Sequence, residues 1–163
     1  MHLTPRIETI SQKLLIGMRR RMSLAKNEIP LLWKSFMPRR NEVQNKKNPF
    51  LYSIEVYDDL SYFKHFNPSL EFDKWAAVEV STEDEIPSDM EIFIIPHGSY
   101  AIFLFKGSEQ EVFSFYAAIF NEWLPSTNYE LDNRPHFACM GEQYKKGDPN
   151  SEEEIYIPIK LGI

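Results

Sequence analysis

Glu154 and Tyr156 are the residues whose types and spacing most directly suggest chemistry. They lie in the segment EEEIYIPIK, residues 152–160, where three isoleucines alternate with them. Successive side chains of a strand point to opposite faces, so Glu154 shares a face with Tyr156 and the isoleucines share the other. A carboxylate beside aromatic rings can hold a flat cation, since each ring adds about 0.5–2 kcal/mol of cation–π attraction. The alternative is that this glutamate is simply solvated at the start of a strand.

A second strand has the same two-faced pattern. In KWAAVEV, residues 74–80, the small apolar side chains at 76, 78 and 80 suit packing against a helix. Trp75 and Glu79 point the other way. If this strand and the strand that contains Glu154 occupy matching positions in the sheet, Trp75 and Glu154 are expected to face one cleft. Burial there would raise the pKa of Glu154, which would also suit a general acid or base.

Other kinds of chemistry have weak support. His2, His65, His97 and His136 are scattered and lack the spacing of a metal site. The single cysteine, Cys139, lies in an apolar strand segment and is interpreted as a small buried side chain. The chain has no glycine-rich phosphate loop and no nucleophile elbow. We therefore expect no metal and no cofactor.

Composition narrows the class of protein. The chain has 163 residues, 43% of them hydrophobic and 14% aromatic, with a formal charge of −6. That charge disfavours nucleic acid as a partner, and the short basic run Arg19–Arg21 is interpreted as a solvated strand edge or helix end. The lone cysteine, the lack of a long apolar segment and the lack of a signal peptide predict a cytoplasmic protein that does not bind membranes.

Helix and strand patterns repeat along the chain. One helix is predicted over 27–40, capped by Asn27, and a second over 108–125, opened by a Ser108–Glu111 capping box and stopped by Pro125. Strands are predicted at 13–23, 50–59 and 74–81 around the first helix. The corresponding strands around the second helix are predicted at 99–107, 136–145 and 152–161.

These elements predict an α+β fold made of two β-α-β-β modules. Half one covers about residues 1–82 and half two about 89–163, and the exposed loop 81–91 joins them. Each half has one helix, which can cover only one face of its strands. We expect a curved antiparallel sheet with pseudo-twofold symmetry, helices on one side, and a ligand groove between the halves.

The chain resembles the GyrI-like small-molecule-binding family, the effector-binding domain of AraC- and MerR-type bacterial regulators. The resemblance spans almost the whole chain. In the first half it is carried by PRIETI, MSLAKNEIPLLWKSFMPR and FDKWAAVEV. In the second half it is carried by GSYAIFLFKG, EWLPSTNYELDNRPHF and SEEEIYIPIK.

The resemblance implies a pocket for lipophilic, cationic or aromatic molecules with a glutamate at its centre, which corresponds to Glu154. Aromatic residues line the pocket in this family. The residues expected to do so here are Trp75, Tyr116, Trp123, Tyr156, Tyr52 and Phe137. Because PRIETI begins at residue 5, no DNA-binding domain is expected ahead of it.

Three functions remain open from the sequence. The first is a sensor or sequestering protein in which Glu154 is the counter-ion of a bound cation. In the second, which the resemblance implies for some stand-alone relatives, Glu154 is catalytic and directs water at electrophilic, cyclopropane-bearing compounds. In the third, a protein partner such as gyrase or a separate regulator is bound. A monomer or a homodimer is expected.

Overall fold

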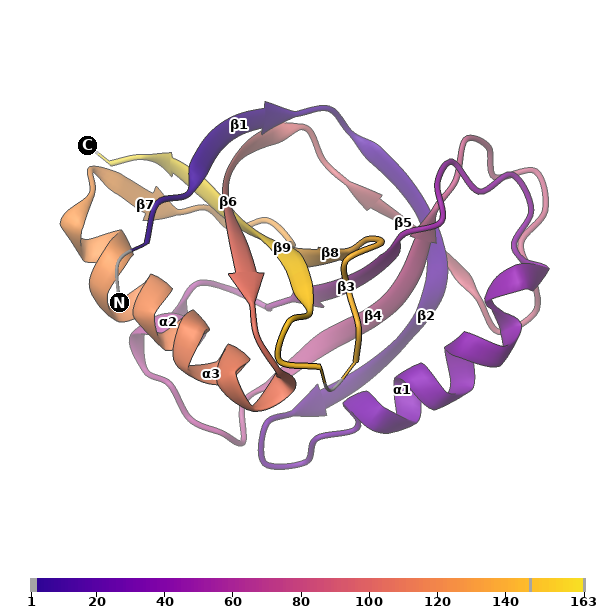
Figure 1. Ribbon diagram of the computed structural model, residues 1–163, viewed down its shortest axis with the longest axis horizontal. Helices are drawn as coiled ribbons and strands as arrows, with labels where there is room; N and C mark the ends of the chain where they lie inside the picture. Colours follow the sequence, from indigo (N-terminus) through magenta and orange to yellow (C-terminus); the bar gives the residue numbers. More distant parts are fainter. Residues whose placement is uncertain (1–2, 147, 163) are drawn as a thin grey trace.

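The computed structural model describes residues 3–146 and 148–162 and has an α+β architecture (Figure 1). The strands are β1 (Arg6–Ile10), β2 (Lys13–Ser23), β3 (Leu51–Val56), β4 (Glu71–Glu79), β5 (Glu91–Ile95), β6 (Gly98–Lys106), β7 (Tyr129–Leu131), β8 (His136–Met140) and β9 (Glu152–Leu161). The α-helices are α1 (Ile29–Phe36), α2 (Ser61–Lys64) and α3 (Glu109–Ala118).

The sheet has the symmetry expected of a duplicated unit. Its strand order is β1-β6-β9-β8-β3-β4-β2-β5, with β7 paired to β9, and the pairs are antiparallel. The series β2-α1-β3-β4 and β6-α3-β8-β9 correspond element by element. Outward from the central β3–β8 pair, the strands follow the matching orders β3-β4-β2 and β8-β9-β6. The predicted fold class is thus confirmed, while the boundaries near residues 82 and 89 stay a prediction.

Strands β1 and β5, which the sequence patterns did not predict, form the two edges of this order. Each pairs with the other half, β1 with β6 and β5 with β2. Only Ser11 and Gln12 separate β1 from β2, although the two strands lie near opposite ends of the sheet. The sheet must therefore curl, and Figure 1 shows β1 passing over the top of the molecule into β2. The curl gives the sheet an enclosed inner face.

Helices α1 and α3 cover the outer face of the sheet, one for each half (Figure 1). Leu32 and Phe36 of α1 pack in a cluster with side chains of β2 and β4. Phe115 of α3 packs with side chains of β6, β8 and β9. A third apolar cluster, on the inner face, draws on β2, β3, β4, β5, β6 and β8. The helices therefore leave the inner face to the sheet itself.

The first predicted helix is shorter in the structure. The backbone N–H of Ile29 donates to Oδ1 of Asn27 at 2.9 Å, and Pro30 occupies the first turn. Proline is tolerated there because the first turn of a helix has no internal acceptor for its N–H. The α-helix ends at Phe36, and Met37–Glu42 continue as a 3-10 helix.

The second predicted helix begins at the expected capping box of Ser108 and Glu111. Beyond Ala118 the chain widens into a π-helical turn, Ile119–Trp123, and then tightens into a 3-10 turn, Leu124–Ser126. Pro125 lies in the first part of that last turn, where its missing N–H is not needed.

Gly17 permits a close approach of β2 to β4. A Cβ at this position would lie 2.1 Å from the carbonyl oxygen of Ala76 and 2.6 Å from the Cβ of Ala77. Gly17 and Ala77 are directly paired across the two strands. Small residues at this point keep the strands together and leave the inner face to larger neighbouring side chains.

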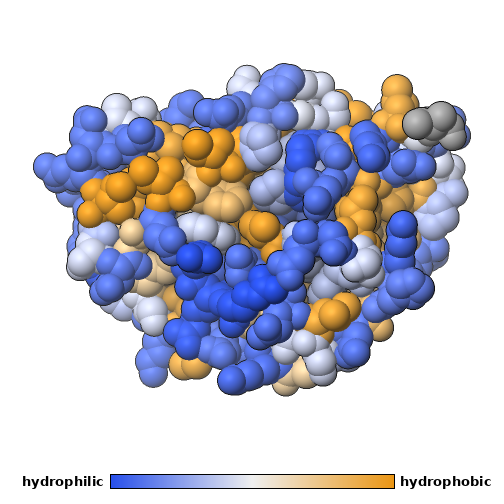
Figure 2. Space-filling model, turned by 180° about the vertical axis from the view of Figure 1, so that it is seen from behind, coloured by the Kyte–Doolittle hydropathy of each residue, from blue (hydrophilic) through white to orange (hydrophobic). Residues whose placement is uncertain are grey.

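Apolar side chains also reach the outer surface. Figure 2 shows one side of the molecule, where hydrophilic residues surround several separate apolar areas. Large exposed apolar side chains include those of Leu104, Phe113 and Leu161. Scattered apolar side chains are normal on a protein surface, so they do not by themselves mark a binding site.

Candidate functional site

Antiparallel pairing aligns side chains of four central strands in two neighbouring rows on the inner face. The first row consists of Glu154, Cys139, Tyr52 and Ala77. The second row consists of Tyr156, Phe137, Ile54 and Trp75. Directly paired residues of antiparallel strands point to the same side of a sheet. Strand pairing thus brings five of the seven residues predicted from the sequence onto one face.

The rings on this face pack against one another. We call them the inner aromatic cluster: Tyr52, Trp75, Phe93, Tyr100, Phe137 and Tyr156. Phe137 and Tyr156 are stacked, with ring centroids 4.2 Å apart and planes 14° apart. Trp75 lies 4.8 Å from Phe93, and Tyr100 lies 5.3 Å from Phe137. A ligand ring that inserts between these rings must displace some of these contacts.

Glu154 lies at the accessible edge of the inner aromatic cluster. Its side chain is 34% exposed, and its Oε2 is 2.7 Å from Nη2 of Arg6 on β1. The hydroxyl of Tyr156 donates to Oε1 of Glu154 at 3.4 Å. Burial, with the charge of Glu154, raises the pKa of Tyr156, so this phenol stays a hydrogen-bond donor at neutral pH. The carboxylate thus already has a cationic partner in this conformation.

Glu79 is a second carboxylate on the inner face that was not proposed from the sequence as a site residue. It is buried, accepts a hydrogen bond from the Tyr52 hydroxyl at 2.9 Å, and has Lys13 Nζ and Lys47 Nζ at 3.7 and 3.8 Å. Burial raises the pKa of Tyr52, and Glu79 adds to the effect. The alternation of residues 74–80 had placed Glu79 on the same face as Trp75, so the sequence contained a signal that Glu79 lies on the inner face. Its several partners suit a structural role.

Tyr116 and Trp123 lie elsewhere. Both pack in the outer-face cluster beneath α3. The ring of Trp123 meets Phe103 at 5.1 Å and Tyr129 at 6.4 Å, and Tyr116 stacks on Phe120 at 6.5 Å. The structure therefore separates these two rings from Glu154 by the thickness of the sheet.

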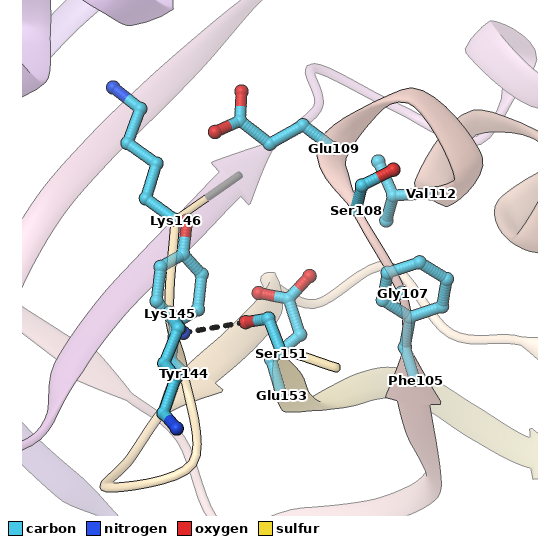
Figure 3. A pocket seen from close by; sticks show the side chains of 10 residues that line it. All are labelled: Phe105, Gly107, Ser108, Glu109, Val112, Tyr144, Lys145, Lys146, Ser151 and Glu153. Carbon is cyan, nitrogen blue, oxygen red and sulfur yellow. Dashed lines mark hydrogen bonds between the residues drawn. The ribbon is translucent and has the colours of Figure 1, made fainter. Parts of the chain in front are cut away.

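A cavity of about 50 Å³ lies between the end of β6, the start of α3 and the segment before β9 (Figure 3). Glu153 lines it together with Tyr144 and Ser151, whose Oγ accepts a hydrogen bond from the backbone N–H of Lys145 at 2.7 Å. Burial raises the pKa of Glu153 to about 7. None of the seven predicted site residues lines this cavity. Glu153 and Glu154 are adjacent in β9 and point to opposite faces.

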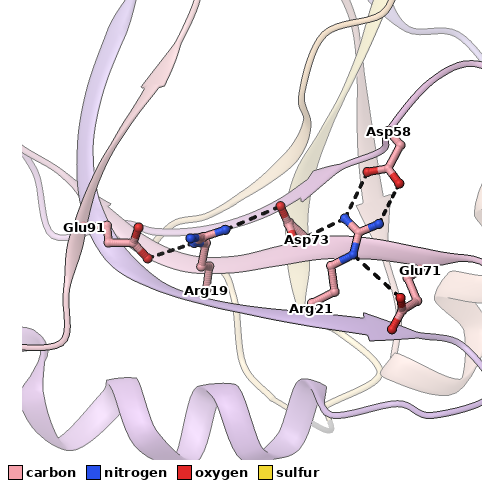
Figure 4. A network of polar contacts seen from close by, with 6 residues as sticks. All are labelled: Arg19, Arg21, Asp58, Glu71, Asp73 and Glu91. Atoms are coloured by element: carbon pink, nitrogen blue, oxygen red, sulfur yellow. Dashed lines mark hydrogen bonds and ion pairs between the residues drawn. The ribbon is translucent and has the colours of Figure 1, made fainter.

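Carboxylates surround two arginines of the basic run on β2 (Figure 4). Arg19 Nε lies 2.8 Å from Glu91 Oε2, and Arg21 Nη2 lies 2.6 Å from Asp58 Oδ2. Both arginines also lie within 3.8 Å of Asp73. This part of β2 therefore presents paired charges instead of a positive patch.

Neither a metal site nor a membrane span is found within residues 3–146 and 148–162. Histidine, cysteine, aspartate and glutamate nowhere gather there in a group of three or more that could hold a metal ion. The helices of this part are too short or too polar to cross a membrane.

Comparisons with known proteins agree with this architecture. A structure of SAV2435 bound to tetraphenylphosphonium superposes with a TM-score of 0.71 at 15% identity, covering 97% of this chain and 94% of that one. A cryo-EM structure of an EcmrR–DNA complex has a TM-score of 0.71 at 15% identity, covering 98% of this chain and 58% of that one. These likenesses show the fold.

Sequence relatives point the same way. The transcriptional regulator BrlR of Pseudomonas aeruginosa is 29% identical over 146 residues, which are 88% of this chain and 51% of that protein. A DNA gyrase inhibitor of Erwinia billingiae is 30% identical over 97 residues, 56% of this chain and 61% of that protein. The chain thus spans about half and three fifths of the lengths of these relatives.

The description of the family model that matches the chain is "GyrI-like small molecule binding domain", and the match covers residues 3–160. The chain therefore belongs to the GyrI-like small-molecule-binding family.

Proposed function

We propose that the inner face binds lipophilic aromatic cations and that Glu154 is their counter-ion. The observation that carries this proposal is the position of Glu154, at the accessible edge of a set of buried rings and beside the Tyr156 hydroxyl. The structural relative SAV2435 is bound to tetraphenylphosphonium, a cation of this class. Such a domain would act as a sensor or as a sequestering protein.

Binding would exchange contacts within the protein for equivalent contacts with the ligand. The stack of Phe137 on Tyr156 would open to admit a ligand ring, so the apolar surface that this stack buries would be covered again by the ligand. The ligand's positive charge would replace the Arg6 guanidinium beside Glu154. Rings around the ligand would add cation–π attraction of about 0.5–2 kcal/mol each.

The test compares Glu154→Gln with Glu153→Gln, which makes the same substitution one residue away on the opposite face. Calorimetric titration with tetraphenylphosphonium gives the dissociation constant of each protein. We expect Glu154→Gln to weaken binding by about 1.4- to fivefold, the range for a partly exposed charge pair of about 0.2–1 kcal/mol. Glu153→Gln should bind as the wild type does.

Two results would overturn the proposal. If the wild type binds neither this cation nor other lipophilic aromatic cations, the inner face is not their site. If both variants bind as tightly as the wild type, Glu154 is not the counter-ion.

The catalytic alternative stays a prediction and needs a separate assay. Consumption of an electrophilic cyclopropane by the wild type, with loss of turnover in Glu154→Gln, would support a hydrolase. A protein partner such as gyrase or a separate regulator also stays a prediction. Co-purification of the purified chain with gyrase subunits would test it.

A further inference from the structure

The indole N–H of Trp75 is a buried donor without an acceptor among the residues that the structure describes. The residue is 6% exposed, and within the part of the chain that the structure describes its Nε1 makes no hydrogen bond. Most buried N–H groups in proteins are paired, because an unpaired one loses its bond to water without replacement. Trp75 belongs to the inner aromatic cluster and contacts Phe93 there. The unpaired donor therefore lies on the face that the proposed function assigns to the ligand.

Strand order gives the distance between this donor and Glu154. Glu154 is on β9 and Trp75 on β4, with β8 and β3 between them. Three strand spacings of about 4.8 Å, with an offset of two residues or about 7 Å along the strands, make about 16 Å across the sheet, and the curvature of the sheet shortens the direct path. Phe137 and Ile54 lie between the two ends, in the same row as Trp75. This stretch between an anion and a donor is apolar and partly aromatic.

We propose that the preferred ligands are elongated aromatic cations that carry a hydrogen-bond acceptor, such as a carbonyl or ether oxygen, at the end remote from the charge. This inference rests on the proposed function and deepens it. Glu154 would hold the charged end, the rings would cover the middle, and Trp75 Nε1–H would donate to the acceptor. The acceptor would make Trp75 a specificity-determining residue beyond its role as an apolar wall.

The test uses two phosphonium ions of equal shape. Each carries three phenyl groups and a biphenyl arm, which ends at its 4′ position in an acetyl group in one compound and in an isopropenyl group in the other. Only the acetyl oxygen can accept a hydrogen bond. We expect the wild type to bind the acetyl compound about three- to tenfold more tightly, as for one net hydrogen bond to a buried donor. Trp75→Phe should bind the two compounds equally, and Trp123→Phe, changed on the outer face, should keep the preference.

A spectroscopic measurement on the intact protein guards against a folding defect in Trp75→Phe. The chain has three tryptophans, so a proton–nitrogen NMR spectrum contains three indole N–H signals. The Trp75 signal should move downfield with the acetyl compound and much less with its isostere.

The outcomes separate this inference from the proposed function. If the wild type binds both compounds equally and the Trp75 signal responds alike to both, the acceptor inference fails while cation binding stands. A preference that persists in Trp75→Phe would also overturn it. If neither compound binds the wild type, the proposed function itself fails.

Discussion

Replacing Arg6 with glutamine is predicted to raise the affinity for lipophilic cations. Nη2 of Arg6 lies 2.7 Å from Oε2 of Glu154, and its Nε contacts Glu8 on the same strand. The guanidinium therefore holds the position that the proposed function assigns to the ligand's charge. A cation can pair with Glu154 only after this internal competitor has moved.

The size of the effect follows from the exposure of the pair. The side chains of Arg6 and Glu154 are 50% and 34% exposed. An ion pair as accessible as this contributes about 0.2–1 kcal/mol, since solvent screens it. Because about 1.4 kcal/mol changes a binding constant tenfold, its removal should raise the affinity by about 1.4- to fivefold.

Calorimetric titration of tetraphenylphosphonium into Arg6→Gln and Arg19→Gln provides the assay. Arg19 is a matched control, because its side chain is 48% exposed and pairs with Glu91 at 2.8 Å, away from Glu154. Both variants lose one positive charge, so any general gain in attraction for cations appears in both. A neutral ligand such as triphenylmethanol should show no gain with Arg6→Gln. If folded Arg6→Gln binds the cation no more tightly than Arg19→Gln does, Arg6 does not compete for Glu154.

Three further predictions concern stability and reactivity. Lys74 is buried with its Nζ 3.2 Å from Oε1 of Glu55, so Lys74→Met should lower the unfolding free energy by about 3–5 kcal/mol. Adding Glu55→Leu should recover most of this loss. Urea denaturation of the single and the double variant measures both effects. Burial raises the pKa of Glu153 to about 7 from an ordinary 4.5, so between these values the folded protein keeps a proton that the unfolded chain releases, and the unfolding free energy falls as pH rises. Glu153→Gln should remove this part of the pH dependence, and urea midpoints at pH 5 and pH 8 that shift as in the wild type would contradict it. Burial also raises the pKa of the Cys139 thiol to about 11, so its alkylation at pH 7.5 should be slow. Because Cys139 shares an inner-face row with Glu154, saturating tetraphenylphosphonium should slow the alkylation further. Mass spectrometry follows the reaction, and a labelling rate that the cation leaves unchanged would count against the site.

Local patterns were sufficient to predict most of the elements. The capping box of Ser108 and Glu111 and the alternation in residues 152–160 each reflect geometry over a few neighbouring residues. The same alternation placed Trp75 and Glu154 on one face of their strands before any pairing was known. Edge strand β1 was missed because four of its five residues are exposed, so it has no apolar face to reveal it.

Helix patterns were less informative about the site. The family resemblance assigned Tyr116 and Trp123 to the pocket, but the helix predicted over 108–125 did not specify which face of the sheet it covers. Both pack on the outer face because the helix itself lies there. An apolar stripe shows which side of a helix is buried but does not show which face of the sheet it packs against.

By itself, the sequence determined most of the elements, the duplicated order and the face on which Glu154 points, because backbone geometry imposes these over short distances. Tertiary structure decided which strands are neighbours, and so brought Arg6 of the first strand to Glu154 of the last. It also enclosed the rings of the inner face and left the indole N–H of Trp75 without an acceptor among the described residues. These features depend on pairing between distant segments, which is set by the curl of the whole sheet.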